Sequence, residues 1–212
     1  MTTALPSSWP TRLPLVAILR GVQPDEVLAH GQALLNAGFD ALEVPTNSPD
    51  WALSVGLLHQ HLGQRAWVGA GTVWQTSQLD AMVSAGARLM VMPHTDAALI
   101  AEGVRRGLHV VAGFATASEA FAALRAGAQA LKLFPAGAAG LQTMQALRAV
   151  LPPQVPVLAV GGVTPANLHT CLAAGCHGAG LGSDLYKPGQ SVTTTTERAQ
   201  AFVQAWRALQ SR

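Results

Sequence analysis

The amino-acid sequence predicts an α/β fold in which a single domain forms a (β/α)8 barrel, the TIM-barrel class. Short apolar runs typical of buried parallel strands alternate with predicted helices. The predicted helix-to-strand junctions lie 20 to 25 residues apart, at positions 38, 63, 86, 107, 127, 152 and 175, and all but the proline at 152 are glycines. Seven junctions after a first strand give eight strands, which suits the compact end of this class. An open doubly wound sheet is the competing fold, but it lacks a glycine fingerprint after the first strand.

The composition favours a well-buried protein that acts on small molecules. Hydrophobic residues make up 50% of the 212 residues and charged residues 11%, below the roughly 25% typical of soluble domains, which suggests extensive burial and subunit association. With a net charge of +2 and no basic cluster, nucleic acid is not an expected partner. No apolar run is long enough to cross a bilayer, so no membrane partner is expected either. Two cysteines give no disulfide framework, and with no signal-peptide pattern we expect a cytoplasmic protein.

The elements follow in order from the first strand. We expect one domain over residues 1–212, with residues 1–11 as an irregular lead-in. Residues 13–19 form the first predicted strand, and a helix from Pro24 to Gly38 follows, with proline and acids in its first turn. Residues 41–44 form the next strand, stopped at Pro45. The later units repeat this pattern, and a final helix over about 197–209 is expected to cover the seam between the last strand and the first.

Lys132 is the most informative residue, because it lies within the apolar run 130–135 and the chain has one other lysine. Strand alternation directs Lys132 toward the barrel axis and its neighbours Leu131 and Leu133 toward the helices. A buried lysine must be paired, neutralised by a lowered pKa, or placed at the mouth of a cavity. A neutral amine in a pocket is a nucleophile toward carbonyl groups. The alternative is a lysine whose stem is buried and whose amine reaches solvent.

Glu43 is the carboxylate that the same alternation points to the axis, since Leu42 and Val44 face outward. It is a candidate general acid or base. Alternatively, it is a structural partner of Lys132 or Arg20. A carboxylate in direct contact with Lys132 would raise the pKa of the amine and oppose its nucleophilicity, whereas a separation bridged by water would avoid this.

The other candidate residues stand where the strands end, which is where barrel enzymes place their chemistry. Exposed amides at Gly161 and Gly162, before a helix expected to start near Pro165, favour an anion such as phosphate, and Ser183 adds a hydroxyl from the next loop. Alternatively, these glycines only make tight turns. His169, Cys171, Cys176 and His177 match no zinc spacing, so no metal site is predicted.

An ordered set of motifs resembles the 2-keto-3-deoxy-6-phosphosugar aldolases over nearly the whole chain. The segments are 16–21 (VAILRG), 42–45 (LEVP), 69–73 (GAGTV), 131–135 (LKLFP), 159–163 (AVGGV) and 180–185 (GLGSDL). The resemblance implies a class I retro-aldol reaction without metal or cofactor, which splits a phosphorylated keto-deoxy sugar acid into pyruvate and glyceraldehyde 3-phosphate. It also implies a homotrimer.

The resemblance implies a role for each matching residue. Lys132 matches the Schiff-base lysine and Glu43 the general acid/base. The other matches bind substrate: Thr72 holds the pyruvate end, Phe134 forms a wall of the pocket, and Gly161, Gly162 and Ser183 take the phosphate. We further expect substrate-binding residues at Arg20, Asn47, Pro93 and Val160.

Two positions point to the branch that acts on the galactonate-derived substrate. The gluconate-derived branch usually has arginine at the place of Asn47 and threonine at the place of Val160. We expect Arg20 to bind the substrate carboxylate instead, and an apolar Val160 to reject the C4 epimer only modestly. The alternatives are a gluconate-type or dual-specificity aldolase and, from other classes, a phosphosugar epimerase or a non-catalytic sugar-phosphate binding barrel.

Overall fold

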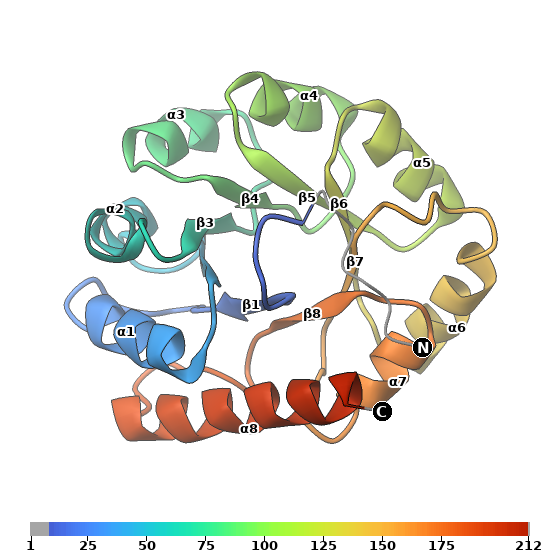
Figure 1. Cartoon of the computed structure of the whole chain (residues 1–212). Coiled ribbons are helices and arrows are strands. Elements are labelled where there is room, and N and C mark those ends of the chain that lie inside the picture. Colours follow the sequence, from blue (N-terminus) through green and yellow to red (C-terminus); the bar gives the residue numbers. More distant parts are fainter. Residues whose placement is uncertain (1–8, 212) are drawn as a thin grey trace.

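Eight parallel strands close into a barrel in the computed structural model, which describes residues 9–211 (Figure 1). Each strand pairs with the next along the chain, and β8 pairs with β1 to close the ring. The helices form an outer ring around the strands. The predicted (β/α)8 fold is confirmed. The strands are β1 (Leu15–Ile18), β2 (Ala41–Pro45), β3 (Trp67–Gly71), β4 (Leu89–Val91), β5 (His109–Phe114), β6 (Ala130–Leu133), β7 (Val157–Val160) and β8 (Gly178–Leu181).

The helices alternate with these strands along the described chain. They are α1 (Val27–Ala37), α2 (Trp51–Leu62), α3 (Ser77–Ser84), α4 (Ala97–Arg105), α5 (Ala117–Arg125), α6 (Ala138–Leu147), α7 (Leu168–Ala173) and α8 (Val192–Gln210). As expected, α8 packs against α1 and α7 and so covers the seam between β8 and β1. In residues 9–211, no helix combines the length and the apolar character that crossing a bilayer requires.

The strand side chains divide into two apolar clusters, because successive residues of a strand face opposite sides. Leu42, Val44, Leu131 and Leu133 belong to the cluster between the strands and the helices. A smaller cluster fills the barrel interior with Trp9, Val16, Ala41, Leu89, Val91, Val111, Ala130 and Leu158. The predicted inward orientation of Glu43 and Lys132 follows from the same alternation.

Glycine ends most of the helices that it was predicted to end. Gly38 has φ +112°, and its N–H donates to the Leu34 and Leu35 carbonyls. Gly86, Gly107, Gly127 and Gly175 also have positive φ, the left-handed region that glycine enters without a Cβ penalty. Gly63 differs: it ends α2 at φ −62°, outside the left-handed region, and a Cβ there would lie 2.4 Å from the His59 carbonyl oxygen.

Three helices begin elsewhere than predicted. α1 begins at Val27 rather than Pro24, and α7 begins at Leu168 rather than near Pro165. Residues 164–167 form a turn instead, in which the side chains of Thr164 and Asn167 accept hydrogen bonds from each other's backbone N–H. α8 begins five residues before the prediction, because Ser191 caps it by accepting from the Thr194 N–H and so supports a threonine run of modest helix propensity.

The described part of the lead-in closes the N-terminal end of the barrel. Residues 1–8 of the predicted lead-in lie outside the described residues, and 9–11 are irregular as expected. Trp9 is nevertheless buried, with 6% of its surface exposed, and meets His109 edge-on at 5.9 Å between ring centroids. His109 opens β5, and its burial lowers its pKa to about 4. The C-terminal ends of the strands therefore form the open end of the barrel, where an active site can lie.

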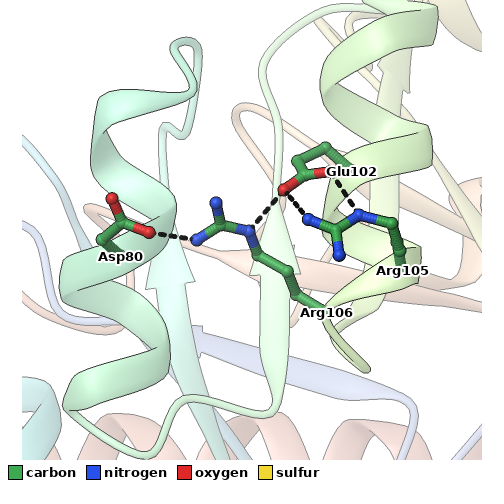
Figure 2. A network of polar contacts seen from close by, with 4 residues as sticks. All are labelled: Asp80, Glu102, Arg105 and Arg106. Carbon is green, nitrogen blue, oxygen red and sulfur yellow. Dashed lines mark hydrogen bonds and ion pairs between the residues drawn. The ribbon is translucent and has the colours of Figure 1, made fainter.

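A charged network fastens α3 to α4 on the outside of the barrel (Figure 2). Arg106 binds Asp80 of α3 and, with Nε 2.7 Å from Oε1, Glu102 of α4. Arg105 donates to both oxygens of the same carboxylate. These hydrogen bonds hold the pKa of Glu102 at about 2. Because solvent reaches most of these groups, we assign the network to helix placement and little net stability.

Replacing Trp9 with alanine is expected to reduce the free energy of unfolding by about 3 to 5 kcal/mol, because the barrel interior loses its largest apolar side chain. The measurement is chemical denaturation followed by circular dichroism. Trp74→Ala is the matched control: Trp74 is 55% exposed, so its loss should change stability by no more than about 0.5 kcal/mol. Equal losses in the two variants would contradict the role of Trp9.

Candidate active site

Glu43 and Lys132 approach the barrel axis from opposite sides. Three strands separate β2 from β6 in either direction around the closed ring. Glu43 is 1% exposed and pairs in register with Ile18 and Gly69, while Lys132 is 5% exposed. Two oppositely charged groups therefore lie inside the barrel on facing strands.

The two groups do not contact each other directly. Neither belongs to an ion pair among the described residues, and Glu43 Oε2 is buried without a hydrogen-bond partner. Burial raises the pKa of Glu43 from 4.5 to about 7, although the charges of Lys132 and Arg20 oppose the rise. Burial likewise lowers the pKa of Lys132, which Glu43 opposes and Arg20 reinforces. The arrangement matches a separated pair and not the structural ion pair that was the alternative.

Gly71 provides the space that the Glu43 carboxylate occupies. A Cβ atom at position 71 would lie 1.8 Å from Glu43 Oε2 and 2.2 Å from its Cδ. The next residue, Thr72, has φ +56°, which is a rare conformation for a β-branched residue. Its carbonyl accepts a hydrogen bond from Thr46 Oγ1 at 2.8 Å. Backbone strain of this kind gathers at functional sites.

Phe134 lies between Lys132 and the glycine loop after β7. The Lys132 Nζ is 4.8 Å from the centroid of the Phe134 ring, within the range of a cation–π contact. A Cβ atom on Gly161 would touch the same ring at 3.7 Å. Although 41% of Phe134 is exposed, one face of the ring thus covers the amine.

Arg20, Asn47 and Thr72 meet at the mouth of the barrel. Arg20 Nη1 donates to Asn47 Oδ1 at 2.6 Å, and Nη2 donates to Thr72 Oγ1 at 3.3 Å. All three follow the ends of strands β1, β2 and β3. Arg20 forms no ion pair with a described residue. Its charge is therefore available to a ligand.

A hollow of about 150 Å³ joins this mouth to the glycine loops. Its lining includes most of the remaining predicted residues: Arg20, Phe134, Val160, Gly161, Gly162 and Ser183. Gly161 and Gly162 have φ +108° and +69°, so the chain turns sharply here. Any amides offered to an anion come from this loop, because α7 starts only at Leu168. Pro93 does not line the hollow; its backbone lies where a side chain on Gly113 would project, and Gly113 is the register partner of Lys132 on β5.

The cysteines and the histidine near α7 and β8 do not form a metal site. Cys171 and Cys176 are buried free thiols, and the backbone N–H of Val157 donates to Nδ1 of His177 at 3.1 Å. Among residues 9–211, no three histidine, cysteine, aspartate or glutamate side chains cluster as a metal site requires.

The family model described as "KDPG and KHG aldolase" matches residues 8–200. The chain belongs to this aldolase family. It is 54% identical over 199 residues to the 2-dehydro-3-deoxy-6-phosphogalactonate aldolase of Escherichia coli K12, covering 94% of this chain and 97% of that protein. The family resemblance found from the motifs is confirmed.

Solved structures agree with this assignment. The native KDPGal structure superposes with a TM-score of 0.94 at 52% identity, covering 96% of this aldolase and 99% of that chain. A KDPG aldolase from Legionella pneumophila, with pyruvate captured at low pH as a covalent carbinolamine, superposes with a TM-score of 0.78 at 26% identity, covering 94% and 98%.

Two residues near the site escaped the sequence analysis. Gly71 was noted only as part of the 69–73 motif. The need for glycine at this position follows from the path of the Glu43 side chain, which no local pattern shows. Thr46 gave no signal, because its partner at position 72 lies 26 residues away.

Gly71→Ala is expected to lower kcat by at least about 100-fold, because the new methyl group displaces the Glu43 carboxylate from its place. The fold should persist, since the clash is with the end of a flexible side chain. The measurements are steady-state kinetics and the thermal midpoint. Gly137→Ala, where a Cβ meets nothing within 4 Å, is the control. An unchanged kcat in Gly71→Ala would show that the carboxylate position does not matter.

Proposed function

We propose that this protein is a class I aldolase that cleaves 2-dehydro-3-deoxy-6-phosphogalactonate to pyruvate and D-glyceraldehyde 3-phosphate in galactonate breakdown. The observation that carries the proposal is the buried Lys132, which forms no ion pair with residues 9–211 and faces Glu43 across the axis. The similarity to the E. coli enzyme of this name supports the substrate.

Lys132 forms the Schiff base. Burial lowers the pKa of its amine and so favours the neutral form, and the neutral Nζ attacks the C2 ketone of the substrate. The carbinolamine that results loses water to give an iminium ion. The carbinolamine captured in the Legionella relative supports this route. The Phe134 ring beside Nζ suits a cation that persists at this nitrogen.

Glu43 moves the protons. As a carboxylate it accepts the proton of the C4 hydroxyl while the C3–C4 bond breaks and its electron pair flows to the iminium, which becomes an enamine. Glyceraldehyde 3-phosphate leaves. The protonated Glu43 then returns the proton to C3, and hydrolysis of the iminium releases pyruvate. A pKa of about 7 populates both forms at neutral pH, which suits a group that must accept and donate.

The binding roles follow the positions of the side chains. Arg20 and Thr72 hold the anionic pyruvate end, and the loop of Gly161 and Gly162 holds the phosphate with Ser183. Val160 forms an apolar wall of the same hollow near C4. Pro93, which follows β4, approaches the site beside Gly113, the in-register neighbour of Lys132 on β5.

The gluconate-derived C4 epimer is the second candidate substrate. Val160 offers no hydroxyl to select one C4 configuration, and an apolar wall rejects a misplaced hydroxyl only modestly. The identity to the Legionella KDPG aldolase is 26%, half of that to KDPGal. This difference favours the galactonate-derived substrate as the better one.

The two epimeric 2-keto-3-deoxy-6-phosphosugar acids, assayed side by side for pyruvate release, distinguish these candidates. We expect faster turnover of the galactonate-derived acid, with measurable turnover of its epimer. Lys132→Ala is the blank and should lose at least about 1,000-fold in kcat. Equal or faster turnover of the gluconate-derived acid would reject the assigned preference, and no turnover of either would reject the aldolase proposal.

We also propose a homotrimer in the cytoplasm. Leu53 and Val83 are 56% and 47% exposed, and both line a hollow between α2 and α3. An apolar surface of this kind on a chain with 11% charged residues suits contact with further copies. The free thiols of Cys171 and Cys176 fit a reducing compartment.

Val83→Lys is expected to dissociate the trimer, because a charge would be buried between subunits. Sedimentation equilibrium should give the mass of three chains for the parent and less for this variant. Val150→Lys is the control, since Val150 is 58% exposed and lies away from the α2–α3 hollow. A parent that sediments as one chain, or a Val83→Lys variant that stays trimeric, contradicts this placement of the interface.

A further inference from the structure

Residues 46–48, which follow β2, form hydrogen bonds with the segments at the C-terminal ends of the neighbouring strands β1 and β3. Toward β3, the Thr46 N–H donates to the Gly71 carbonyl at 2.8 Å and its hydroxyl to the Thr72 carbonyl at 2.8 Å. Toward β1, the Gly21 N–H donates to Ser48 Oγ at 2.9 Å, and Ser48 is buried. The backbone at position 47 is therefore held from both sides.

Asn47 lies at the centre of this fixed loop, and its side chain forms a hydrogen bond with Arg20. Its Oδ1 accepts from Arg20 Nη1 at 2.6 Å, while Nη2 of the same guanidinium reaches Thr72 Oγ1 at 3.3 Å. A long, exposed arginine side chain samples many rotamers unless both of its ends are held. Here two neutral oxygens, Asn47 Oδ1 and Thr72 Oγ1, hold the guanidinium. Each belongs to a segment that is fixed by hydrogen bonds involving backbone groups.

The neutrality of these two acceptors matters. Arg20 lines the hollow that contains Gly161, Gly162 and Ser183 and has no carboxylate partner among the described residues. An aspartate at position 47 would orient the guanidinium equally well but would neutralise it. An asparagine orients it and leaves the positive charge for an incoming anion.

We propose that Asn47 is a positioning residue: with Thr72 it fixes the Arg20 guanidinium, its charge uncompensated, toward the anionic group of the substrate. The inference rests on the proposed function for the identity of that substrate, an acid that also carries a phosphate. Asn47 acts through Arg20 and needs no contact of its own with the substrate.

A double-mutant cycle tests this role. In the parent background, Asn47→Ala should raise KM by about tenfold, as expected for the loss of one hydrogen bond that orients a charged group, and change kcat little. In the Arg20→Ala background, the same substitution should have no further effect. Equal factors in both backgrounds would mean that Asn47 acts on the substrate itself or on the fold, and would overturn the proposal.

Asn47→Asp separates orientation from charge. It should also raise KM, because the carboxylate compensates Arg20, and added salt should change its KM less than that of the parent. A KM equal to that of the parent would overturn the argument from charge. Asn36→Ala, which removes an exposed Gln32–Asn36 bond at the far end of α1, is the control and should keep parental kinetics.

The synthesis direction identifies the anion that Arg20 meets. If Asn47→Ala raises KM for pyruvate, the anion is the carboxylate; if it raises KM for glyceraldehyde 3-phosphate, the anion is the phosphate. An increase in either KM supports the positioning role. If neither KM increases, the proposal is overturned.

Crystal structures of the parent and Asn47→Ala keep the test independent of activity. The guanidinium should be ordered beside Thr72 in the parent and should leave it in the variant. An unmoved guanidinium would overturn the proposal even if the enzyme is an aldolase. Failure of the proposed function would instead appear as a parent enzyme that turns over neither epimer.

Discussion

The chemistry of this barrel depends on keeping one amine and one carboxyl group out of water without letting them pair. In direct contact, Lys132 and Glu43 would stabilise each other's charged forms, and both pKa values would move away from neutrality. On facing strands they remain separate, so burial dominates. A shift of the Glu43 pKa from 4.5 to about 7 corresponds to on the order of 3 kcal/mol between its two protonation states. A closed, well-packed barrel supplies that energy, because its outer apolar cluster holds the strands in place.

The surrounding residues keep Glu43 and Lys132 apart in two ways: they leave room for the carboxylate, and they fix the backbone beside it by hydrogen bonds. Gly71 leaves room for the carboxylate, and the strained Thr72 is held by Thr46. Arg20 brings a second positive charge near the pair, which further lowers the pKa of Lys132 and opposes the rise of the Glu43 pKa. Substrate anions that meet Arg20 would reduce that influence. Substrate binding and the protonation of the catalytic pair are thus electrostatically linked.

Sequence reasoning reached the barrel and its central pair because both depend on periodic patterns. A two-residue alternation directs Lys132 and Glu43 inward, and glycine at helix ends marks the repeated units. It missed what depends on contacts between distant segments. Trp9 lies in an irregular stretch without periodicity, yet it closes the barrel base. The start of α8 depends on the N-cap at Ser191. The hydrogen bond between Arg20 and Asn47 depends on how the loops after β1 and β2 come together.

In the free enzyme, burial and not direct pairing sets the protonation of Glu43. The most direct measurement is a 13C NMR titration of glutamate side-chain carboxyls, with the Glu43 signal assigned by its loss in Glu43→Gln. A raised pKa means that the protonated form persists above pH 4.5 and is lost as the pH rises through the folded value. We expect a midpoint of about 7 for this signal. A midpoint near 4.5 or below would show that the neighbouring positive charges offset or outweigh burial, and would contradict this role of burial.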